Sequence, residues 1–124
     1  MPNFHFTMHH ASLVVSDTAA SLAFYCGVLG MPQTDRPDLG FPGAWLQLGE
    51  QQIHLLELAN PDPTTGRPEH GGRDRHVALS VPDLEPVREA LDKNGIIYTL
   101  SKSGRKALFC RDPDGNALEI LQRA

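Results

Sequence analysis

Short apolar runs, separated by glycine, proline and acidic residues, predict a series of strands with one helix in each half of the chain. In the first half the runs at 10–16, 31–36, 44–48 and 52–58 predict strands. Between the first two, apolar residues recur every three or four positions over 18–29, which is typical of one face of a helix. Asp17 is placed to cap the start of this helix, and Gly30 follows its end.

The second half repeats this pattern. A histidine is followed seven positions later by an aspartate in both halves, at His10 and again at His76. A helix is expected over 84–94, and strands over 96–100, 106–111 and 117–121. The turn between the last two, Asp-Pro-Asp-Gly-Asn at 112–116, is typical of a hairpin. Each half is therefore predicted to be a β-α-β-β-β module.

The segment 59–74 shows no periodicity and is rich in proline and glycine, so it is expected to connect the modules. It separates module 1, about 6–58, from module 2, about 75–122. A module of ~60 residues buries too little surface to be stable alone, so we expect the modules to pair within one domain, 1–124.

Composition and charge exclude several classes of protein. The chain is 40% hydrophobic and 21% charged, which is typical of globular proteins. Its net charge of −4 argues against a nucleic-acid or anionic membrane partner, and no apolar run reaches the ~20 residues of a membrane span. Two cysteines, Cys26 and Cys110, are too few for a disulfide framework and are expected in the core. A cytoplasmic protein is expected.

The repeat singles out four residues with metal-binding side chains: His10 and His76 on the first strands, and His54 and Glu119 on the last. Glu119 follows His54 by 65 positions, as His76 follows His10 by 66. Taken singly, each could be an ordinary surface residue, but their coincidence under the repeat favours a site for Ni(II), Zn(II), Co(II), Mn(II) or Fe(II). A carboxylate buried within an apolar strand also needs a proton, a cation or a metal as partner. The remaining histidines lack a repeat partner and are read as surface or loop residues: His5, His9 and His70. Strand alternation points the side chain of His9 away from the face that His10 occupies.

Motifs distributed over nearly the whole chain carry a resemblance to a known superfamily. They are His10-Ala-Ser-Leu with Asp17, Ala23-Phe24-Tyr25 with Val28-Leu29-Gly30, His76-Val-Ala-Leu with Asp83, and Asp112-Pro-Asp-Gly-Asn with Glu119. The chain resembles the vicinal oxygen chelate superfamily of glyoxalases, bleomycin-resistance proteins and extradiol dioxygenases, and within it the small glyoxalase-I-like proteins. The resemblance implies an α+β fold of two paired βαβββ modules whose curved sheet surrounds a divalent metal.

The resemblance also implies the site and its chemistry. Residues at the positions of His10, His76 and Glu119 are recurrent metal ligands, and His54 stands where glyoxalase I often has Glu or Gln. Short members of the superfamily usually dimerise, so His10 and His54 of one subunit would meet His76 and Glu119 of its partner. Glu119 would serve as ligand and general base on a small substrate that chelates the metal through neighbouring oxygens, as in lactoylglutathione lyase.

Two departures from glyoxalase I leave the substrate open. Val14 stands where glyoxalase I commonly has the arginine that holds a glutathione carboxylate, although a basic residue of a loop could replace that contact: Arg73, Arg75, Lys102 or Arg105. His54 in place of Glu makes the site less negative by one charge. Two other functions therefore stay open: an Fe(II) dioxygenase built on two histidines and one carboxylate, and a drug-binding or resistance protein in which Trp45 forms an aromatic wall.

Overall fold

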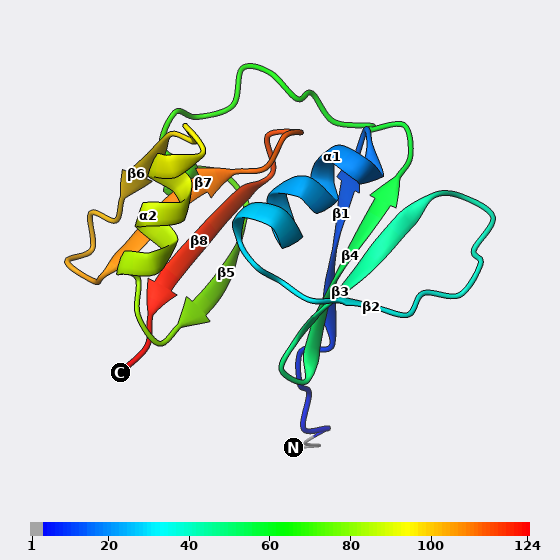
Figure 1. Cartoon of the computed structure of the whole chain (residues 1–124), viewed down its shortest axis with the longest axis horizontal. Helices are drawn as coiled ribbons and strands as arrows, with labels where there is room; N and C mark the ends of the chain where they lie inside the picture. Colours follow the sequence, from blue (N-terminus) through cyan, green and yellow to red (C-terminus); the bar gives the residue numbers. More distant parts are fainter. Residues whose placement is uncertain (1–3) are drawn as a thin grey trace.

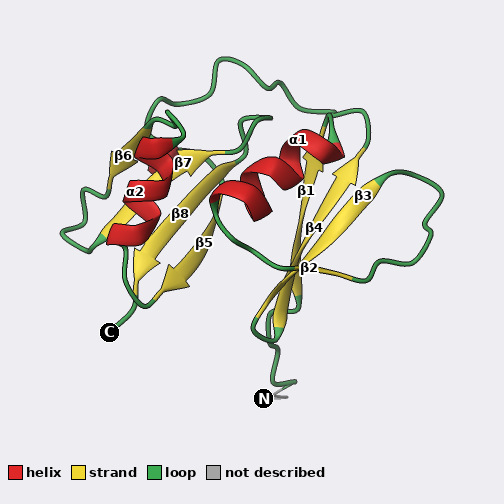
Figure 2. Cartoon of the chain, in the orientation of Figure 1, coloured by secondary structure: helices red, strands yellow, loops and turns green. Residues whose placement is uncertain are grey.

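The computed structural model describes residues 4–124 and contains two four-stranded sheets, one from each half of the chain (Figures 1 and 2). The first has the order β1 (His10–Val15), β4 (Gln51–Glu57), β3 (Gly43–Leu48), β2 (Gln33–Thr34). The second has the order β5 (His76–Val81), β8 (Ala117–Gln122), β7 (Ala107–Arg111), β6 (Tyr98–Leu100). In each sheet the first strand runs parallel to the last, and the other pairs are antiparallel. The predicted α+β fold of paired βαβββ modules is confirmed.

One helical segment lies against each sheet, on the side that faces the viewer in Figure 1. In the first module α1 (Thr18–Leu22) begins at Asp17, whose side chain accepts a hydrogen bond from the Ala20 amide at 3.2 Å. It continues as a π-helix over Ala23–Val28. In the second module α2 spans Glu85–Lys93. The expected single α-helix over 18–29 is therefore α-helical only in its first turn.

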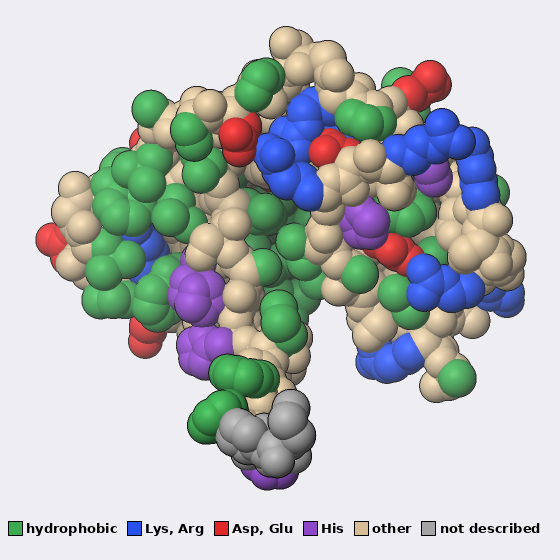
Figure 3. All heavy atoms as spheres, turned by 180° about the vertical axis from the view of Figure 1, so that it is seen from behind, with side chains coloured by type: hydrophobic (Ala, Val, Ile, Leu, Met, Phe, Trp, Pro, Cys, Tyr) green, Lys and Arg blue, Asp and Glu red, His purple; other side chains and the backbone are tan. Residues whose placement is uncertain are grey.

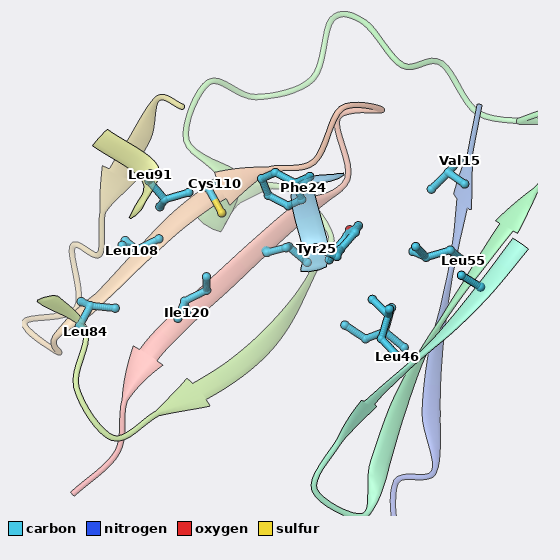
Figure 4. Close-up of a cluster of buried hydrophobic side chains, with 13 residues drawn as sticks. Val15, Phe24, Tyr25, Leu46, Leu55, Leu84, Leu91, Leu108, Cys110 and Ile120 are labelled. Carbon is cyan, nitrogen blue, oxygen red and sulfur yellow. The ribbon is translucent and has the colours of Figure 1, made fainter. Parts of the chain in front are cut away.

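The helix-facing side chains of both sheets form one buried hydrophobic cluster. Figure 4 shows Val15 and Leu55 from the first sheet and Leu108 and Ile120 from the second, with Tyr25 between the two sheets. Tyr25 and Leu108 have no exposed surface. The strands alternate between this buried side and a side without helices, as a period of two residues requires.

The turn between β7 and β8 joins the two modules through one buried and one partly buried hydrogen bond. The Tyr25 hydroxyl donates to Asp112 Oδ2 at 2.7 Å, and Asn116 Nδ2 donates to the Val14 carbonyl oxygen at 3.1 Å. Asp112 also accepts from two backbone amides of its own turn. The hairpin that the Asp-Pro-Asp-Gly-Asn sequence predicts is confirmed, and it also anchors the end of β1 in the other module.

The connector passes along one edge of the molecule (Figure 1), and its second part is tied to module 2. Arg67 Nε and Arg111 Nη1 each donate to Asp74 Oδ2 at 2.8 Å. These two guanidinium groups hold the pKa of Asp74 well below its usual range. A short 3-10 turn over Gly71–Arg73 brings the chain back to β5. The connector, every residue of which the structure describes, contains no other helix or strand between β4 and β5, and this turn is a packed element within it.

Candidate metal centre

The strand register places the four predicted ligands at equivalent positions of the two sheets, on the faces that carry no helix. On β1, Ser12 pairs with His54, and His10 lies two residues before Ser12. On β5, Ala78 pairs with Glu119, and His76 lies two residues before Ala78. His10 therefore shares a face with His54, and His76 shares one with Glu119. Figure 3 views the molecule from behind and shows histidine side chains over both halves of this surface.

In module 2, His76 and Glu119 form a close pair. His76 Nε2 lies 3.2 Å from Glu119 Oε1, and the His76 and Phe109 rings pack at right angles with 5.2 Å between their centroids. The other ring nitrogen, Nδ1, lies 2.8 Å from the Asp74 carbonyl oxygen, which can only accept, so Nδ1 carries a proton and donates. Glu119 is only 4% exposed, and its carboxylate therefore needs a charged or hydrogen-bonding partner.

This pair fits a divalent metal ion. Two ligands that bind one ion through bonds of ~2.1 Å at near right angles lie roughly 3 Å apart, close to the observed separation of His76 Nε2 and Glu119 Oε1. A metal-binding histidine almost always donates its second N–H to a carbonyl or carboxylate oxygen, which His76 does towards Asp74. His76 Nε2, which faces Glu119, therefore remains available to a metal.

In module 1, His54 lies between two other rings. Its ring stacks on His10 with 3.9 Å between centroids and on Trp45 with 4.1 Å, and both pairs are nearly parallel. His54 Nε2 lies 2.8 Å from Gln52 Oε1. Burial, followed by the nearby charges of His10, His9 and Arg36, lowers the pKa of His54. The neutral imidazole that a metal requires is therefore favoured at this position.

His9 contacts the site although strand alternation pointed it away from the face of His10. Strand β1 begins only at His10, so the alternation does not extend back to His9. The two Nδ1 atoms lie 2.8 Å apart, and the rings meet edge to face at 5.1 Å. His9 is exposed, as expected of a surface residue, and its ring also contacts that of His10.

The structure brings the four predicted ligands together as two pairs rather than as one cluster. The His10–His54 pair belongs to the first sheet and the His76–Glu119 pair to the second. Within residues 4–124, no three histidine, cysteine or acidic side chains of a single chain approach closely enough to hold a metal ion. His10 and His76 do line a common cavity of about 290 Å³ between strands β1 and β5.

The three residues proposed for substrate contact differ in their surroundings. Trp45 covers one face of the His54 ring. Arg105 Nη2 donates to Glu119 Oε2 at 2.9 Å, so it lies at the site. Lys102 is exposed, and no hydrogen bond or ion pair joins it to another part of the described chain.

Sequence reasoning missed three residues that shape the site. Asp74 acts through its backbone carbonyl, which leaves no signal in the sequence. Phe109 lies directly opposite Glu119, as Trp45 lies opposite His54, so the repeat could have identified it once the hairpin register was known. His70, expected in a loop, packs against Phe109 at 4.8 Å and contacts the Thr99 hydroxyl at 2.6 Å.

Comparison with known proteins identifies the family. Residues 7–120 match the model of the Glyoxalase/Bleomycin resistance protein/Dioxygenase superfamily, and the chain belongs to this superfamily. It is 32% identical over 120 residues to Glyoxylase I 4 of Arabidopsis thaliana, covering 92% of this chain and 69% of that protein. It is 30% identical over 122 residues to lactoylglutathione lyase of Salmonella typhimurium, covering 91% and 90%.

The fold has close counterparts among solved structures. A glyoxalase/dioxygenase from Nostoc punctiforme superimposes with a TM-score of 0.76 over 100% of this chain and 95% of that one, at 24% identity. Homologues named glyoxalase I and lactoylglutathione lyase support a glyoxalase-like enzyme. Among the described residues, no helix has both the length and the apolar character needed to cross a membrane.

Proposed function

We propose that the protein is a glyoxalase-I-like lyase or isomerase that uses a divalent metal held by His10, His54, His76 and Glu119. The observation that carries this proposal is the His76–Glu119 pair, with its 3.2 Å separation and its histidine oriented by the Asp74 carbonyl. The relatives named lactoylglutathione lyase support the reaction class. The metal is Ni(II), Zn(II), Co(II), Mn(II) or Fe(II), which this set of nitrogen and oxygen donors suits.

When bound, the metal would supply positive charge next to two neighbouring oxygens of the substrate. Glu119 is the only carboxylate among the four proposed ligands, so it is the base that removes the C–H proton beside the substrate carbonyl. Its burial in strand β8 strengthens its interaction with any nearby cation. The rings of Trp45 and Phe109 pack against His54 and His76 in the two halves of the site.

We further propose that the active unit is a homodimer in which module 1 of one subunit faces module 2 of the other. The division of the four ligands between two sheets supports this arrangement. So do the outer edges of β1 and β5, which pair with no other strand among residues 4–124. Each dimer would then hold two composite sites, each with His10 and His54 from one subunit and His76 and Glu119 from the other.

The experiment is a comparison of hemithioacetals and catechols as substrates, in air and without oxygen, after loading with each metal. Isomerisation of a hemithioacetal without oxygen is expected. Glu119→Gln should then lower the rate by ~10²–10⁴, because general-base catalysis is lost. Glu50→Gln, which changes an exposed turn residue, is the matched control and should leave the rate unchanged.

Two results would contradict the proposal. Turnover only with Fe(II) and oxygen would assign a dioxygenase instead. A Glu119→Gln variant with the full rate would remove Glu119 from its role as base. Hemithioacetals of glutathione and of other small thiols are both included, because Val14, whose carbonyl is bound by Asn116, offers no charge to a glutathione carboxylate.

A further inference from the structure

The two carboxylate oxygens of Glu119 have different partners. Oε1 faces His76 Nε2 at 3.2 Å, and Oε2 accepts from Arg105 Nη2 at 2.9 Å. The Glu119 side chain is 6% exposed, whereas that of Arg105 is 59% exposed. A solvent-exposed arginine therefore reaches inward from the β6–β7 loop to a buried carboxylate.

The loop fixes the direction of this arginine. Ser103 Oγ accepts from both the backbone amide of Arg105, at 3.3 Å, and its side-chain Nε, at 3.2 Å. Ser101 Oγ lies 2.7 Å from Ser103 Oγ and shares a hydrogen bond with it. The guanidinium is thus held at Nε while Nη2 donates to Glu119. A planar group held at two of its nitrogens has little freedom to turn away.

We propose that Arg105 is a positioning residue for the metal ligand Glu119. By holding Oε2, Arg105 leaves only Oε1 for the metal and makes Glu119 a ligand through a single oxygen. A carboxylate without such a partner can bind a metal through one or both oxygens. This inference rests on the proposed function only in that Glu119 must be a metal ligand.

The neighbouring Lys102 provides the control, because it lies in the same loop and carries the same charge without contacting Glu119. Three variants are compared with the unaltered protein: Arg105→Gln, Arg105→Lys and Lys102→Gln. Co(II) is titrated into the metal-free protein, and both its dissociation constant and its visible absorption spectrum are recorded. The spectrum reports the number and geometry of ligands, which a merely structural role would not change.

Arg105→Gln is expected to weaken Co(II) binding ~10–100-fold, the usual effect of removing a partner of a metal ligand, and to alter the spectrum as Oε2 becomes available. Arg105→Lys should recover part of the affinity, and Lys102→Gln should match the unaltered protein. Unchanged or tighter Co(II) binding by Arg105→Gln would overturn the inference, as would an equal loss in Lys102→Gln.

Glu119→Ala separates this inference from the proposed function. If Glu119→Ala binds Co(II) as tightly as the unaltered protein, Glu119 is not a ligand and the proposed metal site itself is wrong. If Glu119→Ala loses affinity while Arg105→Gln does not, only the role of Arg105 is wrong. Because the Arg105 side chain is mostly exposed, its variants are expected to fold, and thermal unfolding of each metal-free variant verifies this.

Discussion

At the scale of single residues, each module has an aromatic side chain opposite the proposed metal ligand on its last strand. Trp45 pairs with His54 across β3 and β4, and Phe109 pairs with Glu119 across β7 and β8. A large ring beside a ligand excludes water and restricts the rotamers of its neighbour. This symmetry extends the internal repeat from the ligands to the side chains that support them.

Trp45 makes metal binding at His54 directly observable. It is the only tryptophan of the chain, and its ring lies 4.1 Å from that of His54. We expect Ni(II) or Co(II) to quench its fluorescence in a saturable manner, because these ions accept excitation energy at short range. His54→Ala should abolish the quenching, whereas His5→Ala, which changes an exposed histidine that is not a proposed ligand, should preserve it. Equal quenching in His54→Ala would place the metal elsewhere.

Tyr25 is expected to be important for stability rather than for catalysis. Its hydroxyl donates to the buried Asp112, and Tyr25→Phe leaves one oxygen of that carboxylate without this donor. The loss should lower the free energy of unfolding by ~1–3 kcal/mol, as measured by urea denaturation. Tyr98→Phe is the control, since its hydroxyl makes only contacts of 3.4 Å near the surface. Equal effects of the two substitutions would contradict this assignment.

The buried Tyr25 hydroxyl should also make the free energy of unfolding decrease at alkaline pH. Burial, followed by the charge of Asp112 and its hydrogen bond, raises the pKa of Tyr25 above its ordinary value. The folded protein therefore keeps this proton where the unfolded chain, with a tyrosine pKa of ~10, releases it. The contribution is complete below pH ~10 and is lost as the pH rises further. Urea denaturation at a series of pH values above ~10 should show that the free energy of unfolding declines less steeply for Tyr25→Phe than for the unaltered protein. Parallel declines of the two proteins would refute this role of the Tyr25 hydroxyl.

At the scale of elements, hydrophobic periodicity and turn residues predicted every strand and both helices. The ends differ by one or two residues at most positions, because they depend on local hydrogen bonds. The expected strand at 31–36 is reduced to Gln33–Thr34. The π-helix over Ala23–Val28 was not predicted, since sequence periodicity does not separate it from an α-helix. In it the adjacent Phe24 and Tyr25 are both buried.

The packed part of the connector could not be predicted, because its partners are distant in sequence. Arg67 and Asp74 lie in the segment that was expected to be an irregular connector, and Arg111 belongs to β7. Only the folded chain brings these residues together, at 2.8 Å from each arginine to Asp74. For the same reason the sequence indicated the four proposed ligands but not the Asp74 carbonyl or the orientation of Arg105.

Asp74→Asn should loosen the connector. The substitution removes the negative charge to which both Arg67 and Arg111 are paired, and the Asp74 side chain is only 10% exposed. We expect a loss of ~2–3 kcal/mol in the free energy of unfolding and faster hydrogen exchange over 66–75. Asp62→Asn is the matched control, since its ion pair with Arg75 is exposed and should contribute less than ~1 kcal/mol. A larger loss from Asp62→Asn would contradict the assigned role of Asp74.

At the scale of the whole molecule, we propose that the metal site is composed of residues from two subunits. The sequence repeat indicated four ligands in two pairs, and the folded chain places the pairs on separate sheets. In the proposed homodimer, module 1 of one copy faces module 2 of another and so completes the site. His10→Ala and His76→Ala damage opposite modules and should each abolish tight metal binding when present alone.

The most direct test is metal binding by mixed dimers of these two variants. The variants are unfolded together, refolded, and titrated with Co(II) beside each variant refolded alone. In a mixed dimer one composite site carries both substitutions and the other carries neither, so each mixed dimer should regain one tight site. Metal retained by both variants alone, or a mixture that binds no more than its separate components, would contradict the shared site.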